Sequence, residues 1–202
     1  AYFNSILISG VVTVLVVLLA GMAAFAMVRY RFRGRRFLDS LIIASLMFPV
    51  FSTIIPVFQM LSAINVTDSP VGVILPQIAG NLSFAMVILM GYIRGLPVDL
   101  EESAFLEGCN VFQVFYKVIL PVCRPAFATV AIFSFLWSYN DLFTQLFFLR
   151  SPEKWTITRF LNEVSSQFGT DYGMMCAVGE QTYMLPKNSL LLFNNMDLHM
   201  IN

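Results

Sequence analysis

The sequence contains few charged residues and almost no histidine. Among its 202 residues, 12% are charged and one, His199, is a histidine, whereas soluble domains carry roughly 25% charged residues. A single histidine near the end of a polar tail supplies neither a Ser-His-Asp triad nor a metal cluster. The formal net charge is +0, so the charge balance gives no reason to expect nucleic-acid binding.

Cysteines and nucleotide-binding motifs are also scarce. Three cysteines, an odd number without metal-ligand spacing, are interpreted as small apolar side chains: Cys109, Cys123 and Cys176. The sequence lacks the G-x-x-x-x-G-K-[ST] loop that cradles nucleotide phosphates. We therefore expect no catalytic residue, no cofactor and no metal, and we assign any ATP hydrolysis to a separate chain.

Long apolar runs dominate what is present. The chain is 58% hydrophobic, its mean hydropathy is +0.77, and a helix needs about 20 apolar residues to cross a bilayer. We predict an all-α, polytopic membrane helix bundle with spans at about 2–28, 40–64, 70–93 and 125–149. A last span starting at 173 is weak, because polar and charged residues such as Glu180 and Lys187 interrupt it.

The links between these spans predict the orientation. Five arginines follow the first span, at positions 29, 31, 33, 35 and 36. Because basic loops stay in the cytoplasm, this link is predicted to be cytoplasmic. Alternation then places residues 94–124 in the cytoplasm and 150–172 outside. The alternative is that the arginines form a patch for lipid head groups or nucleic acid.

Residues 97–121 form a polar island in this apolar chain. Asp99 and Glu102 have capping-box spacing at the start of a short helix, which Gly108 is predicted to end. Apolar residues at helical spacing then predict a second, amphipathic helix: Val111, Val114, Phe115, Val118 and Ile119. One alternative is a hairpin lying on the inner membrane surface. Acidic side chains would be repelled by anionic lipid there, which favours a protein partner.

The spacing within this island resembles a known family motif. Glu102-Ser103-Ala104, then Gly108, then nine residues and Val118-Ile119-Leu120-Pro121 resemble the EAA loop of ABC-transporter permeases. Serine and valine stand where the motif has alanine and isoleucine, and both replacements keep the side chain similar in size.

Other segments resemble the carbohydrate-importer branch of that family, the maltose-type permeases. The stretch from Ala24 to Gly34 is similar to its AYALARxRFxG signature, and Trp137 to Asp141 is similar to its SWNDF segment. The resemblance covers about residues 2–175. It implies the fold of an ABC importer permease, multi-pass in a bacterial or archaeal plasma (inner) membrane.

The resemblance also implies partners. These are a second permease subunit, cytoplasmic ATPase subunits, an extracytoplasmic sugar-binding protein and membrane lipid, with no nucleic acid. The implied function is ATP-driven import of a sugar or oligosaccharide. Two alternatives from other classes are a secondary transporter and a non-transporting membrane scaffold or degraded permease fragment.

Site residues are carried over by position. Glu102 and Gly108 correspond to the docking acid and turn glycine of the ATPase-coupling loop, which ends at Leu120 and Pro121. Ser103 and Ala104 allow close approach, while Glu101 and Glu107 are expected to face basic residues of the ATPase. Asn140 and Asp141 are expected to line the sugar path, to pair with polar groups on a neighbouring helix, or to lie near the outer interface.

The end of the chain departs from the family pattern. Residues 1–177 are expected to form the permease domain, whereas 178–202 lack the apolar run and basic tail of the family and form an atypical tail. The resemblance also implies a membrane helix preceding the first span. A changed reading frame is one hypothesis for the tail, and sequencing the encoding DNA tests it.

Overall fold

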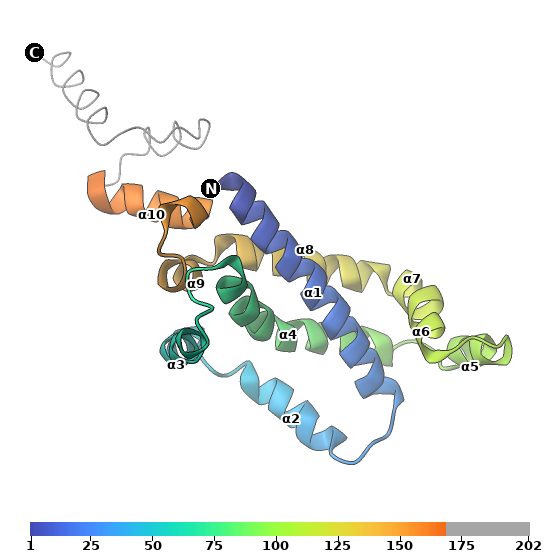
Figure 1. Cartoon of the computed structure of the whole chain (residues 1–202). Coiled ribbons are helices and arrows are strands. Elements are labelled where there is room, and N and C mark those ends of the chain that lie inside the picture. The colour runs from blue at the N-terminus through green and yellow to red at the C-terminus, as the bar shows by residue number, and fades with distance from the viewer. Residues whose placement is uncertain (169–202) are drawn as a thin grey trace, which may run out of the picture. The chain divides into compact units, whose positions relative to one another are not determined.

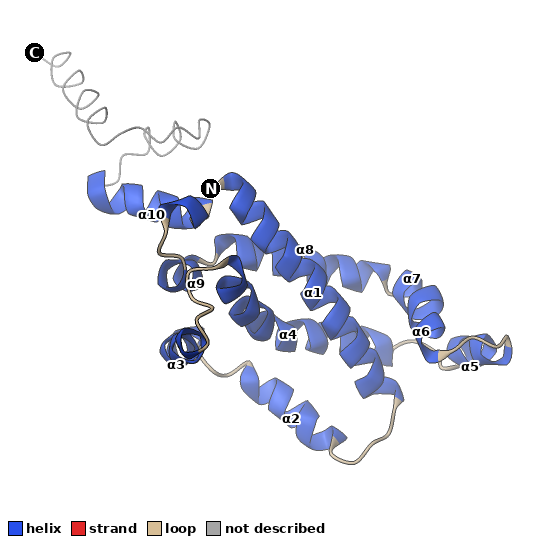
Figure 2. Cartoon of the chain, viewed as in Figure 1, coloured by secondary structure: helices blue, strands red, loops and turns tan. Residues whose placement is uncertain are grey.

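The described part of the chain is built from helices. The computed structural model describes residues 1–168, in which every regular element is a helix (Figure 2). The chain divides into two compact units, 1–160 and 161–202, and α10 (Ile157–Phe168) crosses the boundary. The predicted start of a last span at 173 and the tail 178–202 lie outside the described residues. The all-α prediction is confirmed.

Three long helices form the core of the first unit. α1 (Tyr2–Arg29), α4 (Pro70–Arg94) and α8 (Arg124–Asn140) pack against one another in all three pairs (Figure 1). α1 is apolar around its whole circumference, and one stripe of it is buried: Ser5, Ile8, Ser9, Val12, Val16, Ala20 and Ala24. The remaining apolar face suits lipid, because a helix that is hydrophobic all round belongs in a core or a membrane.

A glycine in α1 permits a close approach at the centre of this packing. A Cβ added to Gly21 would lie 2.7 Å from Phe127 Cε1 of α8 and 3.2 Å from Phe115 Cζ. Small residues at helix interfaces allow neighbouring surfaces to come this close in membrane bundles. The Gly21 contact therefore brings α1 against both α8 and the segment that carries the predicted EAA motif.

The predicted second span, 40–64, comprises two helices. α2 (Arg35–Ser45) and α3 (Val50–Ala63) are separated by residues 46–49. Pro49 explains the break, because proline disfavours helical backbone at the preceding residue and lacks an N–H. Pro56 lies inside α3 without ending it.

The predicted fourth span, 125–149, also contains a break. α8 ends at Asn140, and α9 (Leu142–Phe148) begins after Asp141, whose side chain accepts a hydrogen bond from Thr144 N–H. An aspartate at this position caps the new helix and so favours a restart of the chain. The helical segment Val111–Val122 precedes α8 at a bend of 83°.

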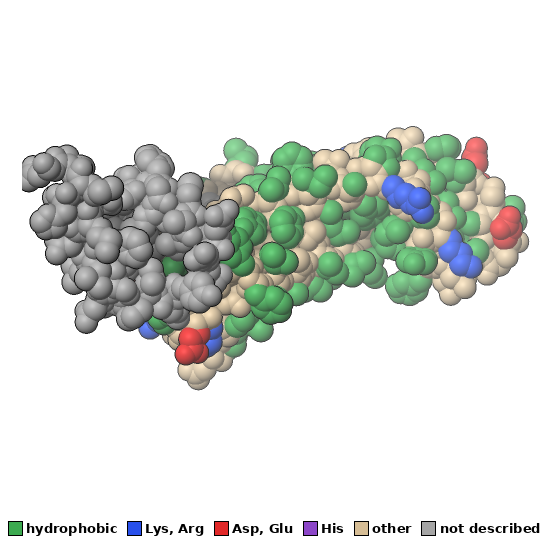
Figure 3. All heavy atoms as spheres, turned by 90° about the horizontal axis from the view of Figure 1, so that it is seen from above, with side chains coloured by type: hydrophobic (Ala, Val, Ile, Leu, Met, Phe, Trp, Pro, Cys, Tyr) green, Lys and Arg blue, Asp and Glu red, His purple; other side chains and the backbone are tan. Residues whose placement is uncertain are grey.

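Two of the described helices, α1 and α4, are long and apolar enough to cross a membrane, and the bent pair around Cys123 gives up to a third. On the face shown in Figure 3, hydrophobic side chains cover the middle of the described part and charged ones gather toward its ends. This distribution matches an apolar membrane layer flanked by polar surfaces.

One loop is tied firmly to a distant segment. Asp68, at φ +57° in the α3–α4 loop, accepts hydrogen bonds from Arg150 N–H, Ser151 N–H, the Ser151 hydroxyl and Lys154 Nζ. Lys154 belongs to the short 3-10 helix η2 (Pro152–Lys154). The hydrogen bonds from Ser151 hold the pKa of the Asp68 carboxyl well below its ordinary value.

This tie is expected to weaken in acid. A carboxyl whose pKa is lower in the folded state stabilises the fold above its unfolded pKa of about 4, and the contribution declines as pH falls below that value. Thermal unfolding of wild type and Asp68→Asn is the measurement. The difference in melting temperature should be largest at pH 6–7 and shrink below about pH 4; a difference independent of pH would contradict the assignment.

Candidate coupling site

The first helix of the polar island begins at Asp99, the residue predicted to cap it. α5 (Asp99–Leu106) is preceded by Val98 and has no side-chain cap hydrogen bond. The predicted capping pair of Asp99 and Glu102 is therefore wrong, because Asp99 is already the first helical residue. The acids still favour the helix electrostatically, since three of them lie in its first turn near the positive end of the helix dipole.

The predicted stop at Gly108 is confirmed. Gly108 adopts φ +85°, a left-handed conformation that glycine reaches without steric cost. Cys109 N–H donates to Ala104 O and Gly108 N–H to Phe105 O, both at 3.0 Å. This pair of hydrogen bonds is a Schellman ending, which satisfies two carbonyls and turns the chain sharply.

The second helix is amphipathic as predicted, but it is not regular. It consists of α6 (Val111–Val114), the π-helical turn η1 (Phe115–Ile119) and α7 (Leu120–Val122). Of the predicted apolar stripe, Val114, Phe115 and Ile119 are buried, Val118 is half-buried and Val111 is exposed. Leu120 N–H bonds to Phe115 O, five residues back. Pro121 follows and has no N–H to continue the α-helical ladder, which fits the wider turn.

A true capping box starts this second helix. Asn110 Oδ1 accepts from Gln113 N–H at 2.9 Å, and Gln113 Oε1 accepts from Asn110 N–H at 2.8 Å. This pair was not predicted, although an Asn followed three residues later by Gln is a recognisable start signal. The cap fixes the direction in which α6 leaves the Gly108 turn.

The two helices expose a largely apolar surface, here called the docking face. It comprises Leu106, Phe112 and Tyr116, which are 90%, 70% and 70% exposed, together with the exposed Glu102 and Glu107. Ser103 and Gly108 are also exposed, whereas Ala104 is buried and Leu120 and Pro121 are half-buried. Large exposed apolar side chains are typical of a surface that contacts another protein or a membrane, and the exposed acids favour a protein.

Glu101 differs from its expected role. Its side chain is buried and pairs with Arg29 at the end of α1, with Nε and Oε1 2.5 Å apart. The expectation that Glu101 faces a basic residue of an ATPase is corrected, because the basic residue is in the same chain. On α5 the buried residues are Glu101 and Ala104, so Glu102 lies on the exposed side.

Aromatic rings continue the contact between this segment and the helix core. The Phe115 ring lies 5.8 Å from Phe25 of α1 and 6.3 Å from Phe127 of α8, measured between centroids. Both distances are in the range for favourable aromatic pairs. The segment carrying the docking face is thus packed on α1 and α8.

Asp141 and Asn140 have different surroundings. Asp141 Oδ2 accepts from Gln77 Nε2 of α4 at 2.9 Å, which is the expected pairing with a polar group on a neighbouring helix. Gln77 in turn accepts from the Ser138 hydroxyl at 2.6 Å. Asn140 is exposed and donates to Leu136 O in its own helix. The structure therefore separates two residues that the sequence analysis treated together.

Comparison with known proteins identifies the family. Residues 6–186 match the family described as "Binding-protein-dependent transport system inner membrane component". The chain belongs to this family. As a member, it is a multi-pass inner-membrane protein and a permease component of a transport system.

Several relatives have named functions. The chain is 34% identical over 87% of its length to the diacetylchitobiose uptake permease NgcG of Streptomyces coelicolor, of which the match covers 59%. It is 32% identical over 95% of its length to the arabinooligosaccharide permease AraQ of Bacillus subtilis, covering 67%. The trehalose permease SugB of Mycobacterium tuberculosis is 39% identical over 72% of the chain, with 53% of SugB covered.

A solved structure supports the fold. A bacterial ABC transporter involved in the import of the acidic polysaccharide alginate aligns with a TM-score of 0.74 and 24% identity, over 91% of this chain and 64% of that one. The chain spans about three fifths to two thirds of the length of most of these proteins. The fold of an ABC importer permease is therefore confirmed.

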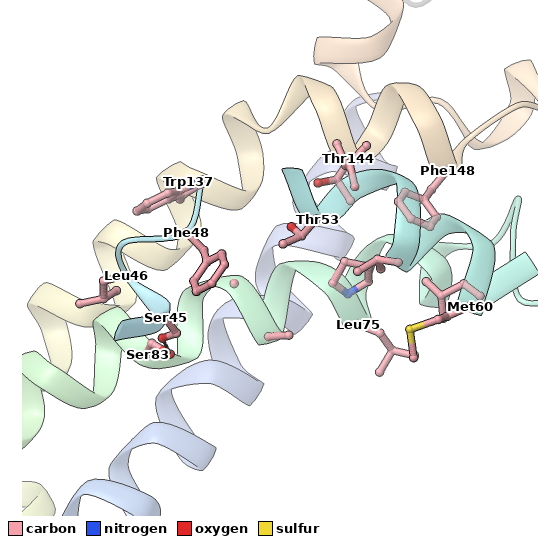
Figure 4. A pocket seen from close by; sticks show the side chains of 16 residues that line it. Ser45, Leu46, Phe48, Thr53, Met60, Leu75, Ser83, Trp137, Thr144 and Phe148 are labelled. Carbon is pink, nitrogen blue, oxygen red and sulfur yellow. Dashed lines mark hydrogen bonds between the residues drawn. The ribbon is translucent and has the colours of Figure 1, made fainter. Parts of the chain in front are cut away.

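The permease has a cavity of about 510 Å³ that lies away from the docking face. Side chains from α2, the α2–α3 link, α3, α4, α8 and α9 line it, and Figure 4 shows Leu46 and Trp137 toward one side and Met60 and Phe148 toward the other. The lining is mainly apolar, with the bonded hydroxyls of Ser45 and Ser83 among its polar groups. Neither Asn140 nor Asp141 lines it. Within residues 1–168, no group of three or more His, Cys, Asp or Glu residues is arranged to hold a metal ion.

Proposed function

We propose that this chain is a membrane-spanning subunit of an ATP-driven importer for a sugar or oligosaccharide, and that the docking face is its contact with a cytoplasmic ATPase. The relatives named for diacetylchitobiose, arabinooligosaccharides and trehalose support the substrate class. The observation that carries the coupling role is the exposure of Leu106, Phe112 and Tyr116 around the Gly108 turn.

The ends of α1 support the orientation. At its Arg29 end, α1 contacts Glu101 and Leu96. At its other end, Asn4 donates to Glu153 O, and the 150–154 segment binds Asp68. The predicted cytoplasmic loop and the predicted outer loops therefore contact opposite ends of one spanning helix, as alternation requires. The docking face then lies in the cytoplasm, where an ATPase subunit can reach it.

The remaining partners follow from this assignment. A second permease subunit completes the path, and a sugar-binding protein delivers substrate from outside. Nucleotide binding moves the permease only if the ATPase contacts the docking face differently in its two states. Asn140, exposed at the end of α8, is the candidate path residue, whereas Asp141 holds α8 and α9 to α4.

Glu102→Lys tests the docking assignment. Reversing this exposed charge is expected to reduce recovery of the ATPase with the purified chain by at least about tenfold, equivalent to roughly 1.4 kcal/mol. Glu153→Lys is the matched control, because it makes the same charge change on an exposed acid near the opposite end of α1. Equal ATPase recovery with wild type and Glu102→Lys would refute the assigned docking face.

A further inference from the structure

Arg29 differs from most of the arginines that follow it. Its side chain is 13% exposed, whereas Arg31, Arg33 and Arg36 are exposed and Arg35 is half-buried. An exposed arginine sets membrane orientation as well as a buried arginine does, so orientation alone does not explain why the Arg29 side chain is largely shielded from solvent. The burial of Arg29 therefore indicates a second role.

The guanidinium of Arg29 joins three parts of the chain. Arg29 is the last residue of α1. Its Nε donates to Glu101 Oε1 in α5 at 2.5 Å, and its Nη2 donates to Leu96 O, just beyond α4, at 3.2 Å. A planar guanidinium can hold two acceptors in fixed directions, which the point charge of a lysine cannot. We call this arrangement the Arg29 clamp.

The clamp attaches the buried side of α5 to α1. Of the eight residues in α5, the buried ones are Glu101 and Ala104. Glu101 lies in the first turn of α5 and Arg29 in the last turn of α1. Each charge thus lies at the helix end whose dipole favours it, which stabilises the ionised pair.

The far end of α1 is also held. Ser5 Oγ accepts from Ile157 N–H at 2.8 Å, and Asn4 Nδ2 donates to Glu153 O at 3.1 Å. α1 is one uninterrupted helix of 28 residues between these contacts and the clamp. A displacement at its Arg29 end can therefore be transmitted along a rigid element to the opposite end.

We propose that Arg29 is a positioning residue for coupling: through Glu101 it holds α5 to α1, so that movement of the docked ATPase displaces α1. This inference rests on the proposed function. Without the clamp, α5 keeps its exposed docking side but is linked to α1 only indirectly, through the Phe115 ring that packs against Phe25. The ATPase then binds and hydrolyses ATP while less of its movement reaches the transport path.

The double variant Arg29→Met/Glu101→Leu tests the clamp in the complete reconstituted transporter. Replacing both members of a buried ion pair by apolar residues leaves no orphan charge and often preserves the fold. We expect ATPase recovery within about twofold of wild type, and sugar transported per ATP hydrolysed to fall by about tenfold, within the range typical of coupled sites. Arg36→Met, which removes an exposed arginine nearby, is the control and should keep the wild-type ratio.

The outcomes separate this inference from the function on which it rests. If wild type shows no ATP-driven uptake, the proposed function fails. If the wild-type transporter takes up sugar in an ATP-dependent way and the double variant transports as much sugar per ATP hydrolysed as wild type, only the clamp is refuted. Loss of the ATPase from the double variant also refutes it, since Arg29 would then act in docking. A single Arg29→Lys change keeps the positive charge but removes the planar guanidinium that donates to two acceptors. It should lower the amount of sugar transported per ATP hydrolysed by a smaller factor than the double variant does.

Discussion

Gly108→Pro is expected to prevent recovery of the cytoplasmic ATPase with this chain, by more than about tenfold. Gly108 has φ +85°, whereas proline is confined to about −65°. The substitution also removes the N–H that bonds to Phe105 O. Leu106 and Phe112 lie on opposite sides of this turn, so a changed turn separates the two halves of the docking face. Co-purification with the ATPase is the measurement.

Gly34→Pro is the matched control for Gly108→Pro. Gly34 has φ +95° and, like Gly108, has no atom within 4 Å of an added Cβ. It lies between α1 and α2, outside the docking face. Both variants carry the same backbone conflict, but only Gly108→Pro should lose the ATPase. Equal loss in both variants, or full recovery in both, would contradict a role specific to the Gly108 turn.

Asp141→Ala is expected to destabilise the helix core by about 2 kcal/mol, because hydrogen bonds to charged groups contribute about 1.5–3 kcal/mol each. For a chain of this size, that lowers the melting temperature by roughly 4–8 °C. The change removes the acceptor for Gln77 Nε2, whose residue is 5% exposed, and the cap of α9. Thermal unfolding in detergent measures the effect.

Asn140→Ala provides the contrast to Asp141→Ala. The exposed Asn140 side chain donates to Leu136 O within its own helix, so the free energy of unfolding of Asn140→Ala should stay within about 0.5 kcal/mol of wild type. If Asn140 lines the sugar path, the variant changes the KM of uptake without changing the melting temperature. A melting temperature as low as that of Asp141→Ala would contradict the separation of the two residues.

Local signals in the sequence predicted the long elements well. α1 and α4 follow long, largely apolar runs that carry no charge before their last residue. The end of α5 follows from Gly108, because glycine accepts a left-handed conformation. The amphipathic spacing also predicted the burial of Val114, Phe115 and Ile119, whereas Val111 is exposed. These features depend on residues that are close together in the chain.

Features set by distant residues were not predicted. The Arg29–Glu101 pair joins positions 72 residues apart, and no local pattern distinguishes a buried acid from the exposed Glu102 beside it. The pairing of Asp141 with Gln77 depends in the same way on how α8 packs against α4. The break at residues 46–49 was accessible from Pro49, but an apolar run on both sides concealed it.

The most direct test of the account is sugar uptake by the complete transporter in proteoliposomes. The complex of this chain, its second permease subunit and its ATPase is reconstituted with ATP inside and the binding protein outside. A labelled panel of chito-oligosaccharides, arabinooligosaccharides and trehalose is then supplied. We predict uptake of at least one sugar that requires ATP hydrolysis and is abolished by Gly108→Pro. Uptake driven by an ion gradient without ATP, or uptake unaffected by Gly108→Pro, would contradict the account.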